Sequence, residues 1–95
     1  MATSREYVAF ALLGLFGTNA VPHLVKGITG QRHQTPAGED SSAVANVVWG
    51  SANAAIAVGL GWRNRDAVTR GTLATAFGTG VLFAVSLASY WSEDE

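Results

Sequence analysis

The stretch Ser41–Trp62, SSAVANVVWGSANAAIAVGLGW, carries no charged side chain. A helix needs about 20 largely apolar residues to cross the hydrocarbon core of a bilayer, which is roughly 30 Å thick. Two further runs of similar length, Tyr7–Val25 and Gly71–Ser92, are also free of charge, so the 6 basic and 7 acidic residues all lie outside the three runs. A soluble bundle would carry charges along the outer face of each helix. The sequence therefore predicts an all-α fold, a bundle of three transmembrane helices.

The length of 95 residues allows one small domain. We expect a single membrane domain over residues 1–95, with helices at about 7–25, 42–62 and 67–91 and a loop at 26–41. The link between the second and third helices is short, which predicts that they form an antiparallel hairpin. Candidate caps precede both helices, and the loop shows no convincing strand pattern. These caps are Asp40, Ser41 and Ser42 for the second helix and Asp66 for the third.

A cleaved signal peptide is the alternative interpretation of the first run. Val8–Phe16 would be its apolar core, and Thr18-Asn19-Ala20 has the small-x-small pattern of a cleavage site. Against cleavage, Glu6 offsets Arg5 in the leading segment, and the apolar run continues beyond the site. We expect the run to remain as a helix.

The distribution of basic residues predicts the orientation of the chain. Four lie in the N-terminal flank and the second connection, and two lie in the first loop: Arg5, Arg63, Arg65 and Arg70 against Lys26 and Arg32. This bias predicts a multi-pass protein of the cell membrane with a cytoplasmic N-terminus and an external C-terminus. The net charge of −1 gives no reason to expect nucleic acid as a partner. The absence of cysteine excludes disulfides and thiolate metal sites.

Small residues recur every four positions in two of the predicted helices. The second helix has Ser51, Ala55 and Gly59, and the third has Ala76, Gly80 and Ala84. Such a stripe lies on one helix face and lets another helix approach closely. There are two alternatives: the stripes pack the second and third helices against each other, or one stripe stays free for another subunit to pack against.

Polar and amphipathic side chains lie inside the first two runs: Asn19, His23, Asn46, Trp49 and Asn53. Antiparallel packing places His23 near the depth of Asn46, and Asn19 near the depth of Trp49. In hydrocarbon, an amide or an imidazole should face a partner rather than lipid. We therefore expect Asn19, His23, Asn46 and the Trp49 indole N–H to form an interhelical hydrogen-bond cluster. Asn53 lies nearer the bilayer centre, where an amide typically makes a helix–helix bond.

The cluster has two interpretations. It is either structural, stabilising the fold by roughly 1 kcal/mol or less per contact, or it is a binding site or proton-sensitive group, because imidazole titrates near neutral pH. A haem or a metal would need a second strong ligand, and His33 lies ten residues from His23 in a loop that we expect to be flexible. We expect no cofactor and no metal. No buried acid accompanies His23 to form a catalytic triad, so we expect no enzyme.

A pattern of polar, glycine and proline positions covers the first half of the chain: Pro22-His23, Gly27, Gly30, Thr35-Pro36, Ser41-Ser42, Asn46, Trp49-Gly50 and Asn53. It resembles a group of small bacterial multi-span integral membrane proteins. Arg32-His33-Gln34 departs from that pattern, which has an apolar or aromatic residue before the Thr-Pro step. The resemblance implies a multi-span membrane protein and brings no activity with it.

These features together predict a non-enzymatic accessory or scaffold subunit of a membrane assembly. Its partners would be membrane lipid and other membrane subunits, or further copies of itself. The alternative is a homo-oligomeric pore, a small transporter or a holin-like protein. An ion path usually shows charge inside the membrane, which the three runs lack. A holin-like protein would need no such charge, so this alternative stays open.

Overall fold

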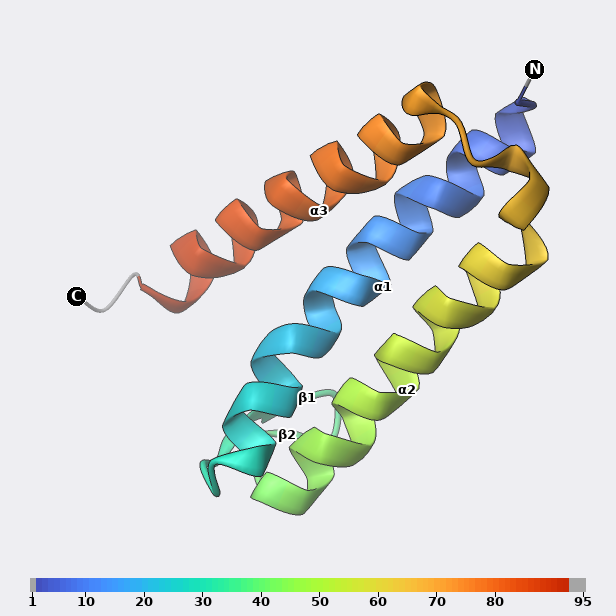
Figure 1. Cartoon of the computed structure of the whole chain (residues 1–95). Coiled ribbons are helices and arrows are strands. Elements are labelled where there is room, and N and C mark those ends of the chain that lie inside the picture. Colours follow the sequence, from blue (N-terminus) through green and yellow to red (C-terminus); the bar gives the residue numbers. More distant parts are fainter. Residues whose placement is uncertain (1, 93–95) are drawn as a thin grey trace.

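The computed structural model describes residues 2–92 (Figure 1). The elements in chain order are α1 (Ser4–Ile28), β1 (His33–Thr35), β2 (Gly38–Ser41), α2 (Ala43–Arg63), a 3-10 turn (Arg65–Ala67) and α3 (Arg70–Trp91). All three α-helices are long and apolar enough to cross a membrane. The predicted all-α, three-helix fold is confirmed, and the chain has the build of a small multi-pass membrane protein.

Helix α1 is longer than the charge-free run that predicted it. It begins at Ser4 because Thr3 and Glu6 form a capping box, in which the Glu6 N–H donates to Thr3 Oγ1 at 3.2 Å and the Thr3 N–H donates to Glu6 Oε1 at 2.8 Å. It ends at Ile28, so Lys26 lies in its last turn. A cation is favourable there because the helix dipole is negative at that end.

The caps of the other two helices partly match the prediction. Ser42, one of the three candidates, caps α2 by accepting a bond from the Ala45 N–H at 3.1 Å. The prediction of Asp66 as the cap of the third helix was wrong. Thr69 caps α3 by accepting a bond from the Thr72 N–H at 3.1 Å, and the Thr69 N–H donates to Thr72 Oγ1 at 2.8 Å. The third helix therefore starts at Arg70 rather than near residue 67.

The first loop contains a small antiparallel β-hairpin that the sequence pattern did not reveal. Its register places Thr35 opposite Gly38 and His33 opposite Ser41. The hydroxyls of Thr35 and Ser41 lie 2.6 Å apart, and Arg32 forms an exposed ion pair with Asp40 at 3.0 Å. Strands of three and four residues are too short for an alternating pattern to be recognised. Side-chain bonds, rather than strand pairing alone, hold the hairpin together.

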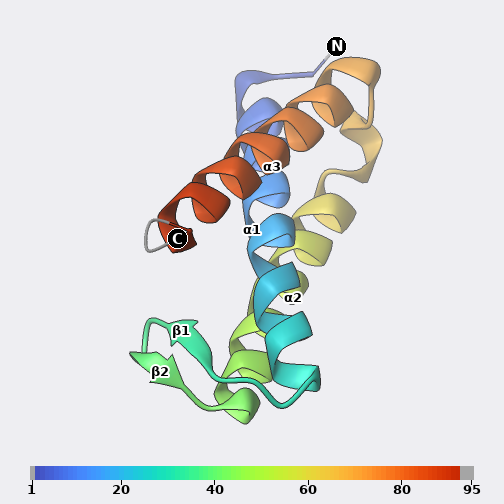
Figure 2. The same ribbon diagram turned by 90° about the vertical axis from the view of Figure 1, so that its left-hand side faces the viewer.

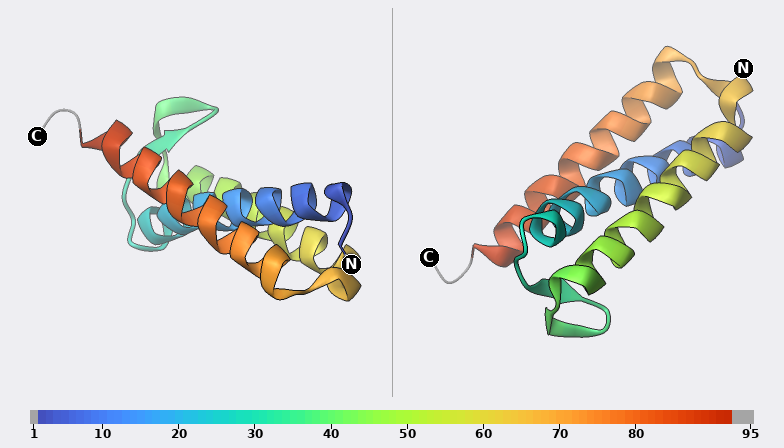
Figure 3. Two further views of the ribbon diagram at one scale, coloured as in Figure 1. Left: turned by 90° about the horizontal axis from the view of Figure 1, so that it is seen from above. Right: turned by 60° about the horizontal axis from the view of Figure 1, so that its bottom comes forward.

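Helix α1 is the central element of the bundle. It contacts both α2 and α3, whereas α2 and α3 hardly touch each other. Figure 1 shows the connection between α2 and α3 beside the start of α1. Helix α2 runs toward this connection, and α3 runs away from it. The left view of Figure 3, seen from above, shows α3 crossing over α1, and the right view shows α1 between α2 and α3. The second and third helices are thus consecutive and opposite in direction, and each packs on α1.

The two small-residue stripes have different positions. The stripe of α3 (Ala76, Gly80 and Ala84) lies along α1: a Cβ on Gly14 of α1 would overlap the backbone carbonyl of Ala76, and a Cβ on Gly80 would lie 2.8 Å from Thr18 Oγ1. The stripe of α2 (Ser51, Ala55 and Gly59) is exposed. The stripes therefore do not pack against each other, and the stripe of α2 remains on the outer surface.

Helices α1 and α2 approach closely at two glycines. A Cβ on Gly50 would lie 2.8 Å from Leu24 Cγ, and a Cβ on Gly27 would lie 2.8 Å from the carbonyl oxygen of Ala43. Contacts this short leave no room for a side chain. The helix backbones are therefore near enough for short polar side chains to meet between them.

The interior of the bundle is small and polar, and its exterior is apolar. Within residues 2–92, the largest fully buried side chains are Asn46, Asn53 and Thr72. Large apolar side chains point outward, among them Ile28 and Phe77, which are each 75% exposed. In water such a distribution would expose much apolar surface, whereas in a bilayer these side chains face lipid.

Candidate functional site

Asn46 is the centre of a polar site at the hairpin end of the bundle. Its side chain is fully buried, and its Nδ2 donates to the backbone carbonyls of His33 and Ser42, each at 3.0 Å, and of Ser41 at 3.3 Å. Its Oδ1 lies 2.8 Å from His23 Nδ1. One amide thus connects α1, the hairpin and the start of α2. The predicted proximity of His23 and Asn46 is present as a direct hydrogen bond.

The bonds of Asn46 determine which nitrogen of His23 carries a hydrogen. Carbonyl oxygens only accept, so the Asn46 nitrogen must face the three backbone carbonyls and Oδ1 must face His23. Since Oδ1 also only accepts, His23 Nδ1 is the donor. In the neutral ring, Nε2 is therefore a hydrogen-bond acceptor. It has no hydrogen-bond partner among residues 2–92.

A second interhelical bond lies deeper in the bundle. Asn19 Nδ2 donates to Asn53 Oδ1 at 3.1 Å, and Asn53 Nδ2 donates to the backbone carbonyl of Trp49 at 2.8 Å. The helix–helix bond predicted for Asn53 is present, and its partner is Asn19. Asn19 was expected to bond within the cluster of His23, Asn46 and Trp49. Its amide instead donates to Asn53, one helical turn beyond Trp49 on α2.

Trp49 takes part in the site through its ring. The predicted hydrogen bond of its indole N–H to the cluster is not formed within the described residues. Its ring lies nearly perpendicular to that of His23, with an interplanar angle of 79° and centroids 6.4 Å apart. Trp49 thus contributes an aromatic wall beside the imidazole.

His33 and Trp91 belong to the site although sequence reasoning left both out. The hairpin brings the His33 ring to 5.5 Å from that of His23, measured between centroids. The ring centroid of Trp91, at the end of α3, lies 4.3 Å from that of His33, and Trp91 Nε1 donates to Gln34 Oε1 at 3.3 Å. Figure 2 shows this end of α3 on the same side of the bundle as the hairpin. The one signal in the sequence was the rigid Thr35-Pro36 turn, which does not specify where a loop folds back.

A pocket of about 360 Å³ opens between these elements. Its walls include the aromatic rings of Trp49, Tyr90 and Trp91 and the polar side chains of Asn19, His23 and Gln34. These polar side chains are two amides and one imidazole, and none of them is an acid or a thiol. Among the described residues, no group of three or more His, Cys, Asp or Glu is placed to hold a metal ion.

The docking of the hairpin is expected to weaken as the pH falls. Burial lowers the pKa of His33 below its ordinary value of 6.5, and the nearby charges of His23 and Lys26 lower it further. An undocked hairpin would take up the proton first as the pH falls through 6.5. The free energy that favours docking therefore decreases as the pH falls from 6.5 to the lower pKa of the docked ring, and it stays constant below that pKa. NMR titration of the His33 ring measures its pKa, and the fluorescence of Trp91, which contacts His33, measures the docking of the hairpin.

His33→Gln is the control for this pH dependence. It removes the titrating ring and keeps a polar side chain on the hairpin, so the Trp91 signal should stay constant as the pH falls through and below 6.5. A pH response of unchanged size in His33→Gln would show that another group causes it.

The side chains of the site can donate and accept hydrogen bonds and pack against flat groups. Its groups are neutral donors and acceptors beside aromatic rings, and His23 is positioned by an amide instead of by the carboxylate that a catalytic triad uses. Two roles fit this chemistry: joining the helices and hairpin, and accepting a hydrogen bond from a ligand. Comparison of the chain with protein-family models, with curated proteins and with solved structures gives no match.

Proposed function

We propose that this protein is a non-enzymatic accessory or scaffold subunit of a larger membrane assembly. The exposed stripe of Ser51, Ala55 and Gly59 on α2 is the observation that supports this role. A Cβ on Gly59 would meet nothing within 4 Å, so the helix of another protein can approach it closely. Small residues favour helix association in lipid because they allow backbones to pack.

The bonds between α1, α2 and the hairpin support a scaffold role. Asn46 and Asn53 bond across the helix interface from positions that are 0% and 1% exposed. Together with the close approach at Gly27 and Gly50, they hold α2 in one position on α1. A partner that binds the outer face of α2 therefore meets a preorganised surface.

A homo-oligomeric pore, small transporter or holin-like protein is the second candidate. The same stripe favours it, since a second copy of α2 can pack there as well as a foreign helix. The bonding of the amide side chains disfavours a pore, because Asn19, Asn46 and Asn53 all bond to groups within this chain rather than facing outward. A water-filled path needs polar groups along its wall.

We also propose that the N-terminus lies in the cytoplasm and the C-terminus outside the cell membrane. The start of α1 and the connection between α2 and α3 lie at the same end of the bundle in Figure 1. This end carries Arg5, Arg63, Arg65 and Arg70, and basic residues favour the cytoplasmic side. A C-terminal alkaline phosphatase fusion should be active and a C-terminal GFP fusion dark. The reverse result would contradict this orientation.

Native mass spectrometry of the tagged protein, extracted from its own membranes in mild detergent, tests the accessory role. A foreign subunit should be present in a stoichiometric amount. Gly59→Leu should remove that subunit, because a Cβ there meets no packed neighbour within 4 Å and the leucine side chain would project into the contact surface. The matched control Val58→Leu changes the neighbouring exposed position and should retain the subunit. A closed homo-oligomer without a foreign subunit would contradict the accessory role and support the pore.

A further inference from the structure

The Nε2 atom of His23 takes no part in the hydrogen bonds that join the helices. His23 is only 3% exposed, and its Nδ1 is bonded to Asn46. Within residues 2–92, His33 Nε2 is the one side-chain polar atom that is both sealed from the surface and without a partner. His23 Nε2 is therefore unpartnered but reachable, and the pocket that His23 lines gives access to the ring.

The chemistry of the pocket selects a neutral hydrogen-bond donor for this nitrogen. An acceptor that is almost buried is costly to leave unpaired, so the complementary group is a hydroxyl or an N–H. A hard divalent cation would prefer anionic oxygen ligands, and the polar side chains that line the pocket with His23 are amides and hydroxyls. The complementary ligand therefore carries no charge at this point.

The walls of the pocket select a flat ring. Trp49, Tyr90 and Trp91 contribute three aromatic side chains to a volume of about 360 Å³. Aromatic side chains favour stacked or edge-to-face contacts with another ring, and this volume lies in the usual range of small-molecule sites. Gln34, whose Oε1 accepts from Trp91, keeps one of these rings in place.

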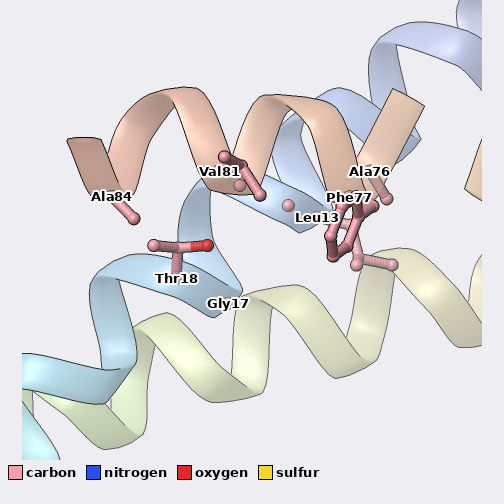
Figure 4. A pocket seen from close by; sticks show the side chains of 9 residues that line it. Leu13, Gly17, Thr18, Ala76, Phe77, Val81 and Ala84 are labelled. Atoms are coloured by element: carbon pink, nitrogen blue, oxygen red, sulfur yellow. The ribbon is translucent and has the colours of Figure 1, made fainter. Parts of the chain in front are cut away.

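An apolar path leads from this pocket along α1 and α3. A second pocket of about 320 Å³ shares Leu87 and Trp91 with the first and is otherwise lined mainly by apolar side chains of the two helices. It shares Thr18 and Ala84 with the open groove of about 430 Å³ shown in Figure 4. The three spaces therefore adjoin one another from the polar site into the apolar middle of the spans.

We infer that this site binds a neutral membrane amphiphile with a hydroxyl-bearing aromatic ring, of the hydroquinone or alkylphenol type. The hydroxyl donates to His23 Nε2, and the ring lies among Trp49, Tyr90 and Trp91. The alkyl tail follows the groove between α1 and α3, which opens to lipid. This inference does not depend on the accessory role, because the groove and the stripe of α2 are separate surfaces.

Tryptophan fluorescence in detergent tests the inference with 2-decyl-1,4-hydroquinone as the probe, kept reduced without oxygen. The Trp62→Phe background removes the exposed indole near the opposite end of α2 and leaves Trp49 and Trp91 as reporters. The dimethyl ether of the same probe keeps the ring and the tail but cannot donate a hydrogen bond. The hydroquinone should bind about tenfold more tightly than the ether, since the ether leaves the acceptor unpaired.

Two pairs of variants connect the binding to this site. His23→Gln should abolish the difference between hydroquinone and ether, whereas Asn64→Gln, at the opposite end of α2 and outside the pocket lining, should retain it. Ala84→Phe should block the groove and weaken binding of the decyl probe about tenfold. Val85→Phe, at an exposed position beside it, should leave binding unchanged. Equal affinity for hydroquinone and ether in the Trp62→Phe background, or no saturable quenching by either, would overturn the inference.

Discussion

Replacing Asn46 with leucine is expected to lower the free energy of unfolding by about 2–3 kcal/mol and to release the hairpin from the helices. Leucine has a similar size, so the change removes hydrogen bonds more than volume. It leaves His23 Nδ1 and the backbone carbonyls of His33 and Ser41 without their bonds to residue 46, whereas the Ser42 carbonyl still accepts from the backbone N–H of residue 46. A single interhelical bond in a membrane contributes less, about 0.6 kcal/mol on average, but Asn46 satisfies several buried groups at once.

Reversible unfolding of the detergent-solubilised protein, followed by circular dichroism, measures this loss. Asn64→Leu is the matched control, because Asn64 makes one side-chain bond, to the carbonyl of Leu60 at the end of α2. It should cost less than about 1 kcal/mol. An Asn46→Leu protein as stable as the Asn64→Leu protein would show that the Asn46 bonds do not hold the site together.

Replacing Gly14 with leucine is expected to separate α3 from α1 and to cost about 3 kcal/mol. Any Cβ at this position overlaps the backbone carbonyl of Ala76. A backbone atom cannot move aside by changing a rotamer, so the helices themselves must part. Because α3 has almost no contact with α2, no other helix would keep it in place.

Pulsed electron paramagnetic resonance measures this separation through spin labels at Val25 on α1 and Val85 on α3, both exposed. The chain has no cysteine, so engineered cysteines are labelled uniquely. Gly78→Leu is the control, because a Cβ there meets nothing within 4 Å. The distance between the labels should lengthen in Gly14→Leu and stay unchanged in Gly78→Leu. Equal distances in both variants would contradict the close crossing of α1 and α3.

The three helices could be predicted because their signal is long and simple. Each span needs about 20 residues without charge, and three such runs are visible directly in the sequence. The ends of the helices were less predictable, because charged residues can lie inside a terminal turn. Glu6 and Lys26 do so in α1, and Arg63 does so in α2.

The candidate site could be predicted only in part. His23 and Asn46 are polar groups in apolar runs, and such groups must find each other in lipid. His23 and Asn46 meet at the expected depth, but the partner of Asn19 depends on how far each amide side chain reaches along the helices, which the spacing of residues does not specify. The contribution of His33 depends on a hairpin held by side-chain bonds. The bonds that dock it on the helices join residues 13 and 57 positions apart, Asn46 with His33 and Trp91 with Gln34, so no local pattern reveals them.

Nitrogen-15 NMR of His23 in lipid bilayers tests most directly the central claim, that Asn46 holds His23 with Nδ1 as the donor. The chain has two histidines, so His33→Gln leaves a single imidazole to assign. The account predicts a neutral ring with the hydrogen on Nδ1 and coupling from that nitrogen to the Asn46 side chain. A ring protonated on Nε2 with Nδ1 bare, or exchanging freely between the two forms, would contradict it.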